Sequence, residues 1–372
     1  MAVFYLLFIM LYVLLLWSIK RQWRQQTSPA SDTVYESRVA LLVPFRDEAE
    51  HLPGLMELLD RNAYPLGEVI FIDDDSSDQS AGIVSGFIQK NGLGNWALLK
   101  SIGIGKKAAL TTGVHFSQAD IILTTDADCV LPRQWVEGMV RPFMRQGIQL
   151  VAGPVMTGSG TGFFSRFQQV EWASIVLLTK YFFSIQRPTM CSGANLAYRR
   201  SAFLAVEGYL ENEKHLSGDD EFLLKKIVKQ FGAGAVTYLH QKETLVETRP
   251  HSSWSGFIQQ RIRWSSKWRL HRSWDHAFSA ALAFAVALVQ LGSWAMLFGN
   301  LGEKLTFIIF WVLKVGVDRV VLGKVLADFH VKVSLWVFLA SSFLHPIYVV
   351  WVGIRAMRGK YTWKGRNNRF NL

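Results

Sequence analysis

The chain has 372 residues, half of them hydrophobic, and a formal net charge of +11 at pH 7. This length allows one large globular domain with additional segments, and the apolar content indicates that part of the chain lies in lipid. Cys129 and Cys191 are too few for a disulfide framework and are not spaced as a zinc site, which favours a reducing compartment for the soluble part. The basic residues cluster beside apolar runs, so we expect an anionic membrane surface or a phosphorylated substrate and discount nucleic acid.

Residues 1–26 predict an N-terminal transmembrane anchor. Met1 to Ile19 carries no charge, and at ~1.5 Å per helical residue this run can cross a hydrocarbon core ~30 Å thick. Basic residues follow the run, whereas a cleavable signal peptide has them in front of it. The positive-inside tendency then puts the N-terminus outside and the next domain in the cytoplasm. A buried core helix is the alternative, since the run is apolar on every face.

Residues 38–250 alternate between short apolar runs and helical patterns. The apolar runs lie at 39–43, 69–72, 96–99, 121–123 and 150–152, and the helical patterns at 52–59, 80–90, 107–115 and 134–144. This alternation predicts an α/β domain with a mostly parallel sheet covered on both faces. Ligands of such sheets bind beyond the carboxyl ends of the strands.

Acidic residues follow two of the predicted strands. Asp73 to Asp78 comes after the second strand, and Thr124 to Cys129 after the fourth. Clustered carboxylates repel one another and need hydrogen bonds or a cation. Turn and helix-cap chemistry accounts for Ser76 to Asp78 equally well, but it accounts poorly for both Asp126 and Asp128. A hard divalent cation, Mg²⁺ or Mn²⁺, prefers such oxygen ligands and would neutralise a diphosphate leaving group.

Seven motifs together resemble the family 2 glycosyltransferases of the GT-A fold. They are VPFRDEAE at 43–50, IDDDSSD at 72–78, GKKAAL at 105–110, TTDADC at 124–129, SGANLAYRRSAF at 192–203, SGDDEFLLKKI at 217–227 and QQRIRW at 259–264. They cover roughly residues 38–265 in family order. The layout is also similar to the membrane-bound members, which include ceramide glucosyltransferases and the cellulose, chitin and hyaluronan synthases.

The resemblance implies a site for a nucleotide-sugar donor and a divalent cation. Asp73 and Asp74 map to the positions that bind the base and ribose, and Lys106 or Lys107 to a cation near base or phosphate. Asp126 maps to a residue that meets the ribose or sugar and, with Asp128, holds the metal. Gln260, Arg263 and Trp264 match a Gln-x-x-Arg-Trp signature, in which the arginine can hold diphosphate and the indole can stack on a sugar.

The same resemblance assigns the general base to the acidic pair at 219–220. Asp220 maps best, and Asp219 stays open because Gly218 and Asp219 replace the commoner residues before the base. Attack on an anomeric carbon requires an acceptor hydroxyl to lose its proton on the face opposite the leaving diphosphate. Ser192 to Asn195 resembles the loop that shapes the acceptor side, and its small residues allow close backbone approach.

The C-terminal part predicts a membrane region. Residues 251–275 are basic and tryptophan-rich, as in a helix on an anionic membrane surface. Within 277–354, two runs are uncharged, at 277–301 and 333–354. The run at 305–329 carries five charges, so we expect it to lie in the interface or to re-enter, giving three spans in all, with four as the alternative. Residues 355–372 form a basic tail that favours the cytoplasm.

These patterns predict an inverting glycosyltransferase integral to the cell inner membrane, with its catalytic domain in the cytoplasm. The donor is a nucleotide sugar, by resemblance a UDP-sugar with GDP as the alternative. The acceptor is a membrane lipid hydroxyl or a lipid-linked glycan. A polysaccharide synthase subunit, or an inactive membrane regulator that binds nucleotide sugar, would carry the same overall layout.

Overall fold

The computed structural model describes residues 1–23, 38–61, 66–212, 218–266, 274–357, 360–363 and 366–369. The chain divides into two compact units. The sheet unit comprises the described parts of 26–158 and 178–249, and the helical unit those of 1–25, 159–177 and 250–372.

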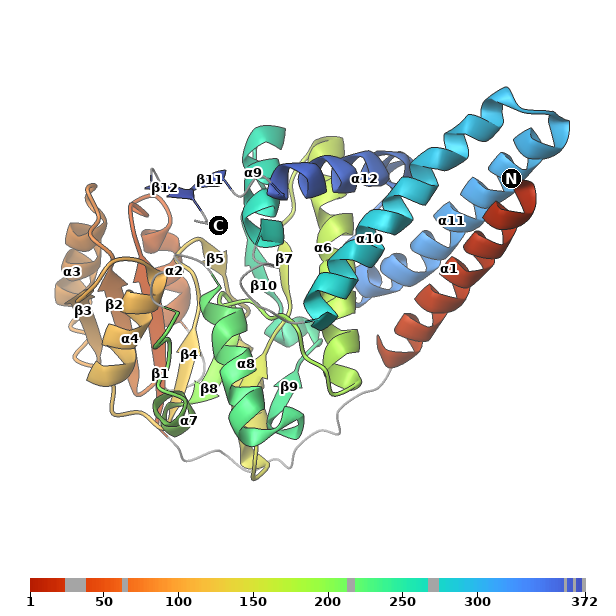
Figure 1. Cartoon of the computed structure of the whole chain (residues 1–372). Helices are drawn as coiled ribbons and strands as arrows, with labels where there is room; N and C mark the ends of the chain where they lie inside the picture. The colour runs from red at the N-terminus through yellow and green to blue at the C-terminus, as the bar shows by residue number, and fades with distance from the viewer. Residues whose placement is uncertain are drawn as a thin grey trace. The chain divides into compact units, whose positions relative to one another are not determined.

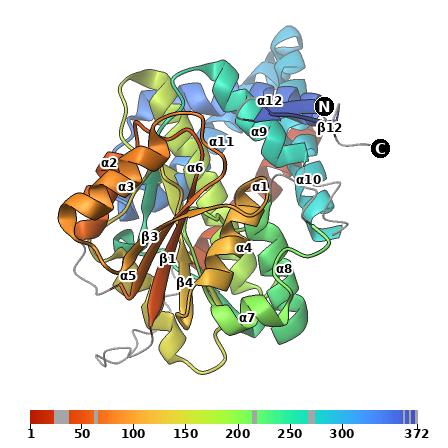
Figure 2. The same ribbon diagram turned by 90° about the vertical axis from the view of Figure 1, so that its left-hand side faces the viewer.

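The sheet unit contains a seven-stranded sheet with the order β3-β2-β1-β4-β8-β6-β9 (Figure 2). Only β8 runs antiparallel to its two neighbours, so the prediction of a mostly parallel α/β sheet is confirmed. The strands are β1 (Val39–Phe45), β2 (Glu68–Asp73), β3 (Trp96–Lys100), β4 (Ile121–Thr124), β6 (Leu150–Ala152), β8 (Leu196–Arg199) and β9 (Val236–Tyr238).

Buried apolar side chains explain why the central strands form. Every residue of β1, β4 and β6 is buried, as expected for parallel strands covered on both faces. Helices α2 (Leu52–Asp60) and α3 (Ser80–Asn91) lie on one side of the strands, and α4 (Lys106–Phe116) and α8 (Asp219–Phe231) on the other (Figure 2). A Cβ on Gly113 of α4 would lie 3.0 Å from both Leu42 methyl carbons, so this glycine lets α4 approach the sheet closely.

A second, three-stranded sheet in this unit has the order β5-β10-β7. Its strands are β5 (Cys129–Val130), β10 (Val246–Thr248) and β7 (Val155–Thr157). Thr248 pairs with Cys129 and with Thr157, so the segment after Asp128 is held between distant parts of the chain. Two short helices, α5 (Trp135–Val140) and α7 (Arg200–Ala205), complete the unit.

The helical unit contains three helices that are long and apolar enough to cross a membrane, counting only described residues. They are α1 (Ala2–Trp23), the segment Phe278–Phe298 that includes most of α10 (Trp274–Gly292), and α12 (Leu335–Ala356). These agree with the uncharged runs of the sequence. The unit also contains α9 (Trp254–Ser265) and the first part of α6 (Gly162–Ser184).

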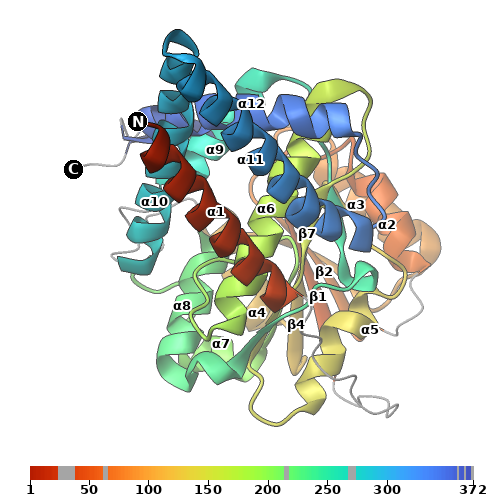
Figure 3. The ribbon, with the colours of Figure 1, turned by 90° about the vertical axis from the view of Figure 1, so that its right-hand side faces the viewer.

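The charged run at 305–329 forms most of one continuous helix, α11 (Leu301–Asp328), which packs along α1 (Figures 1 and 3). The Tyr5 and Phe310 rings meet edge to face, and the Trp23 indole donates a hydrogen bond of 2.8 Å to Asp328. The two helices therefore run in the same direction and end level with each other, while α11 extends beyond the start of α1. A capping box of Asn300 and Glu303 starts α11.

Candidate active site

The acidic residues at the end of β2 bind backbone N–H groups. Asp73 Oδ1 accepts a hydrogen bond of 2.9 Å from the Ser76 N–H, and Asp74 Oδ1 accepts one of 2.7 Å from the Gly105 N–H. Asp74 is only 3% exposed, and this burial raises the pKa of its carboxyl. Because Gly105 directly precedes α4, Asp74 positions the residue that begins that helix, Lys106.

Lys106 joins the acidic motif after β4 to the acidic pair of α8. Its Nζ lies 2.5 Å from Asp126 Oδ1 and 3.4 Å from Asp219 Oδ2, with its side chain 18% exposed. Burial alone lowers the pKa of Lys106, but the two carboxylates more than offset this and raise it above its usual value. The lysine therefore stays charged and holds the two motifs together.

Lys107 does not reach this cluster. Its Nζ donates a hydrogen bond of 2.8 Å to the Asn212 carbonyl and lies 4.3 Å from the centre of the Phe222 ring. The side chain is buried in the packing of α8. Of the two adjacent lysines, Lys106 is the one that pairs with Asp126 of the predicted donor site.

Asp128 lies just before β5. The Thr248 hydroxyl donates to its Oδ2 at 3.3 Å. Burial, followed by repulsion from Asp126 and Glu48, raises the pKa of this carboxyl. The described residues contain no group of three or more His, Cys, Asp or Glu side chains suited to a metal ion. The repelled pair Asp126 and Asp128 fits a hard cation that takes its remaining ligands from a diphosphate and water.

The acidic pair begins α8, where the N-terminal end of the helix favours negative charge. Asp220 Oδ2 accepts a hydrogen bond of 3.1 Å from the Gly193 N–H, and the Thr124 hydroxyl donates one of 2.9 Å to the Gly193 carbonyl. A Cβ on Gly193 would lie 2.5 Å from Asp219 Oδ2 and 3.0 Å from Lys106 Nζ. The absence of a side chain at Gly193 therefore lets this loop pass against the cluster.

Asn195 is a supporting residue to which the sequence assigned no role beyond its loop. Fully buried, it donates from Nδ2 to the carbonyls of Pro154 and Thr244, both at 2.7 Å, and accepts a 2.9 Å bond from the Trp135 indole. These bonds tie the 192–195 loop to the segments just before β7 and β10 and to α5. The motif SGAN marked this loop in the sequence. The three hydrogen-bond partners of Asn195 lie in segments that no local sequence pattern connects to the loop.

The Gln-x-x-Arg-Trp residues lie on α9, in the helical unit. Gln260 accepts a hydrogen bond from Arg261, and Arg261, not Arg263, forms the buried ion pair of this helix, with Glu171. The Arg261 guanidinium also lies 4.3 Å from the centre of the Trp264 ring. Donor binding by Gln260, Arg263 and Trp264 stays a prediction. The basic residues at 267–272 lie outside the described part of the chain.

The sheet thus carries acidic motifs at the ends of β2 and β4, and a charged lysine joins the second motif to the acidic pair of α8, an arrangement suited to a nucleotide-sugar donor. Residues 40–206 match the family described as Glycosyl transferase family 2. The match covers the segment from β1 to α7, which carries the acidic motifs at the ends of β2 and β4.

Similar proteins agree with this family. A Bacillus subtilis protein named "Probable glycosyltransferase YdaM" is 26% identical over 244 residues, which are 61% of this chain and 54% of that protein. An undecaprenyl-phosphate 4-deoxy-4-formamido-L-arabinose transferase of Pseudomonas paraeruginosa is 28% identical over 105 residues, 27% of this chain and 31% of that protein. The chain thus spans about half or less of the length of these curated relatives.

One solved structure matches nearly the whole chain. The mannosyltransferase PcManGT of Pyrobaculum calidifontis, solved with GDP-Man and Mn²⁺, superposes with a TM-score of 0.58 over 95% of this chain and 94% of that one, at 18% identity. This likeness supports the fold.

Proposed function

We propose that the protein transfers a sugar from a nucleotide-diphosphate sugar to a hydroxyl group of a membrane lipid or lipid-linked glycan, with inversion at the anomeric carbon. One observation carries the proposal: Lys106 holds Asp126 and Asp219 against each other, which joins the donor motif to the base motif. A structural ion pair alone would not need the further carboxylates of Asp128 and Asp220 beside it.

The donor lies at the ends of β2 and β4 in this proposal. Asp73 and Asp74 accept hydrogen bonds from the base and ribose, and Asp126 and Asp128 hold a divalent cation. When bound, Mg²⁺ or Mn²⁺ neutralises the diphosphate and stabilises it as a leaving group. The resemblance favours uridine as the base, and the GDP-mannose bound to PcManGT keeps guanosine as the alternative.

Asp220 is the better candidate for the general base. The Asp219 side chain is 12% exposed and lies 3.4 Å from the Lys106 ammonium, so it is engaged in an ion pair. Asp220 is less buried and is oriented by the Gly193 N–H. Asp220 takes the proton of the acceptor hydroxyl while that oxygen bonds to the anomeric carbon, and the bond from that carbon to the diphosphate oxygen breaks on the opposite face.

Membrane-length helices in the chain favour a lipid as the acceptor. The Pseudomonas relative is named for an undecaprenyl-phosphate acceptor, which also favours a lipid. A phosphate monoester is already mostly dianionic at neutral pH and needs little help from a base, whereas a hydroxyl acceptor must lose its proton. The positioned carboxylate of Asp220 therefore favours the hydroxyl.

We further propose that α1, α10 and α11 cross the bilayer, with the sheet unit in the cytoplasm. If α1 crosses, α11 crosses beside it, since the two helices pack side by side along their length. Two of its mid-membrane charges compensate each other: Asp318 pairs with Lys314 at 2.9 Å and also accepts from the Tyr12 hydroxyl at 2.8 Å. Helix α12 lies steeply inclined to them (Figures 1 and 3), and three crossings leave the basic tail on the side of Lys20 and Arg21.

The test of the activity is sugar transfer by the purified full chain in lipid nanodiscs. Labelled UDP- and GDP-sugars are supplied with Mn²⁺, and the Asp220→Asn variant is compared with Asp60→Asn, an exposed position on α2. We expect organic-extractable product from the wild type and from Asp60→Asn, and a loss of at least about 100-fold in Asp220→Asn.

Other outcomes separate the alternatives. Full activity of Asp220→Asn would reject the general base and favour a phosphate acceptor. Label in a polymer would indicate a polysaccharide synthase. Nucleotide binding without transfer from any donor would favour a regulator.

Cysteine labelling tests the topology. A cysteine placed at His330, after α11, should react with an impermeant maleimide only when the cytoplasmic face is open, and one at Asn300, before α11, from the outside. Labelling of both positions from the outside would show that α11 re-enters.

A further inference from the structure

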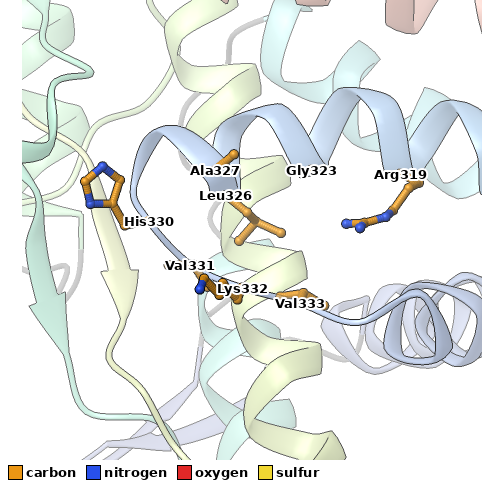
Figure 4. Close-up of a pocket in the computed structure, with 8 residues that line it drawn as sticks. All are labelled: Arg319, Gly323, Leu326, Ala327, His330, Val331, Lys332 and Val333. Carbon is orange, nitrogen blue, oxygen red and sulfur yellow. The ribbon is translucent and has the colours of Figure 1, made fainter.

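A cavity of about 590 Å³ lies at the end of α11 in the helical unit (Figure 4). Its walls are the last turns of the helix and the segment that leads to α12. Three lining residues are basic and the others are apolar or glycine: Arg319, His330 and Lys332, with Gly323, Leu326, Ala327, Val331 and Val333.

The chain reversal after α11 builds this cavity. The Val331 N–H donates to the Leu326 carbonyl at 2.8 Å and the His330 N–H to the Ala327 carbonyl at 3.0 Å, which is the pattern of a Schellman motif. His330 occupies the left-handed position, at φ 58°, where glycine is usual. The reversal sends residues 331–333 back along α11 and leaves a gap between the two segments.

Arg319 extends along α11 toward the end of the helix. One of its guanidinium nitrogens lies 3.5 Å from where a Cβ of Gly323 would be, one turn further on, and the guanidinium lies 4.9 Å from the Phe338 ring centre. In Figure 4 the side chain lies beside α11 and points toward the end of the helix, on the side where Val333 lies. Both Arg319 and Lys332 are exposed.

The carboxylates of α11 near this cavity are engaged elsewhere. Asp318 binds Lys314 and the Tyr12 hydroxyl, and Asp328 binds Lys324 and the Trp23 indole. Among the described residues, Arg319 contacts the Phe338 ring and forms no ion pair. The cavity is therefore positively charged.

The distance of Arg319 from the end of α11 indicates what kind of ligand the cavity binds. Tyr12 lies midway along α1 and binds the residue before Arg319, while Trp23 at the end of α1 binds Asp328. The α-carbon of Arg319 is thus about 13 Å along the axis from the end of α11. An arginine at that depth is costly in lipid unless it reaches toward the headgroups and finds an anion there.

We propose that this cavity binds the phosphate of an anionic phospholipid of the bilayer between Arg319 and Lys332, with the acyl chains along Leu326, Val331 and Val333. A guanidinium and an ammonium are the side chains that bind phosphate in proteins. The favourable interaction between basic residues and the C-terminal end of a helix dipole does not explain Arg319. That interaction fades within the last turn of the helix, and Arg319 lies well before the last turn. The inference rests on the proposed crossing of α1 and α11, and it assigns this lipid no part in sugar transfer.

The test is the unfolding temperature of the full chain in neutral detergent, titrated with phosphatidylglycerol, phosphatidylcholine or inorganic phosphate. We compare the wild type with Arg319→Gln, Lys332→Gln and the control Lys304→Gln, an exposed position at the opposite end of α11. Phosphatidylglycerol should stabilise the wild type saturably, and each cavity variant should bind it about tenfold more weakly, the cost of one charged hydrogen bond. The control should match the wild type.

Three results would overturn the inference. Equal stabilisation by phosphatidylcholine would show that charge is not recognised. An equal effect of inorganic phosphate would show a soluble-anion site. Unchanged binding in both cavity variants would place the lipid elsewhere. Since the readout is binding, it is independent of turnover, and the maleimide experiment tests the crossing separately.

Discussion

The contact between Gly193 and the charged cluster makes Gly193→Ala a stringent test of the site. The added Cβ would lie 2.5 Å from Asp219 Oδ2, where ordinary contact begins at 3.4 Å, so the carboxylate or the loop must move by about 0.9 Å. The carboxylate is held by Lys106 and the loop by the Thr124 hydroxyl, so neither yields freely. A misplacement of about 1 Å at reacting groups costs roughly 100-fold in rate.

We therefore expect kcat to fall about 100-fold while the protein still folds, because overpacking costs only about 1–3 kcal/mol. The assay is the initial rate of sugar transfer in nanodiscs, with the unfolding temperature measured on the same sample. Gly86→Ala is the matched control. Nothing lies within 4 Å of its added Cβ on α3, so activity should be unchanged and stability equal or slightly higher. A wild-type kcat in Gly193→Ala would show that this loop and Asp219 are remote from the reaction.

Three further predictions concern stability. Burial raises the pKa of Asp74, so the fold is stabilised while this carboxyl is protonated, and that stability is lost as pH rises through the raised pKa. The Asp74→Asn variant should therefore have a higher unfolding temperature than the wild type at pH 7, but not below about pH 4. Equal unfolding temperatures at pH 7 would contradict the cost of burying this carboxylate. Asn195→Ala should lower the free energy of unfolding by about 2–4 kcal/mol in denaturant titrations, because it strands two carbonyls and an indole N–H. Asp318→Ala should cost about 3–5 kcal/mol by leaving Lys314 buried without its partner, and the double variant Lys314→Met/Asp318→Leu should recover most of it in thermal melts.

The central strands were predictable because their residues are buried on both faces and read as unbroken apolar runs. All five predicted strands are present, as β1, β2, β3, β4 and β6. The antiparallel strand β8 was not, since it comes from residues 196–199 and inserts between β4 and β6, a pairing that sequence order does not reveal. The small sheet escaped prediction because strands of two or three residues carry no period.

Within the site, the motifs predicted which types of residue come together. Where a motif contains two residues of the same type, the structure shows which contact each of them makes. Lys106 and Lys107 are adjacent, so their side chains leave α4 in different directions, and only the packing of α8 assigns Lys107 to the Asn212 carbonyl. The same holds for α9, where Arg261 takes the buried ion pair.

The charges of α11 show a feature that the sequence could not predict. Counted along the sequence, they argue against a membrane crossing, and α11 does not qualify as a candidate span by hydropathy among the described helices. Their compensation becomes visible only when Tyr12, 306 residues away, is brought to Asp318. A partner that distant has no local signature.

The charge balance at Lys106 carries a last prediction. Three carboxylates, those of Asp126, Asp219 and Asp220, act on the Lys106 ammonium, and burial followed by repulsion from Asp126 raises the pKa of the nearby Asp128. A diphosphate brought to this cluster adds negative charge, so donor binding requires a divalent cation. In titration calorimetry we expect nucleoside diphosphate to bind at least about tenfold more tightly with Mn²⁺ than with a chelator. Asp128→Asn should lose that difference while keeping the wild-type fold by circular dichroism, and tight binding in chelator would refute the cation site.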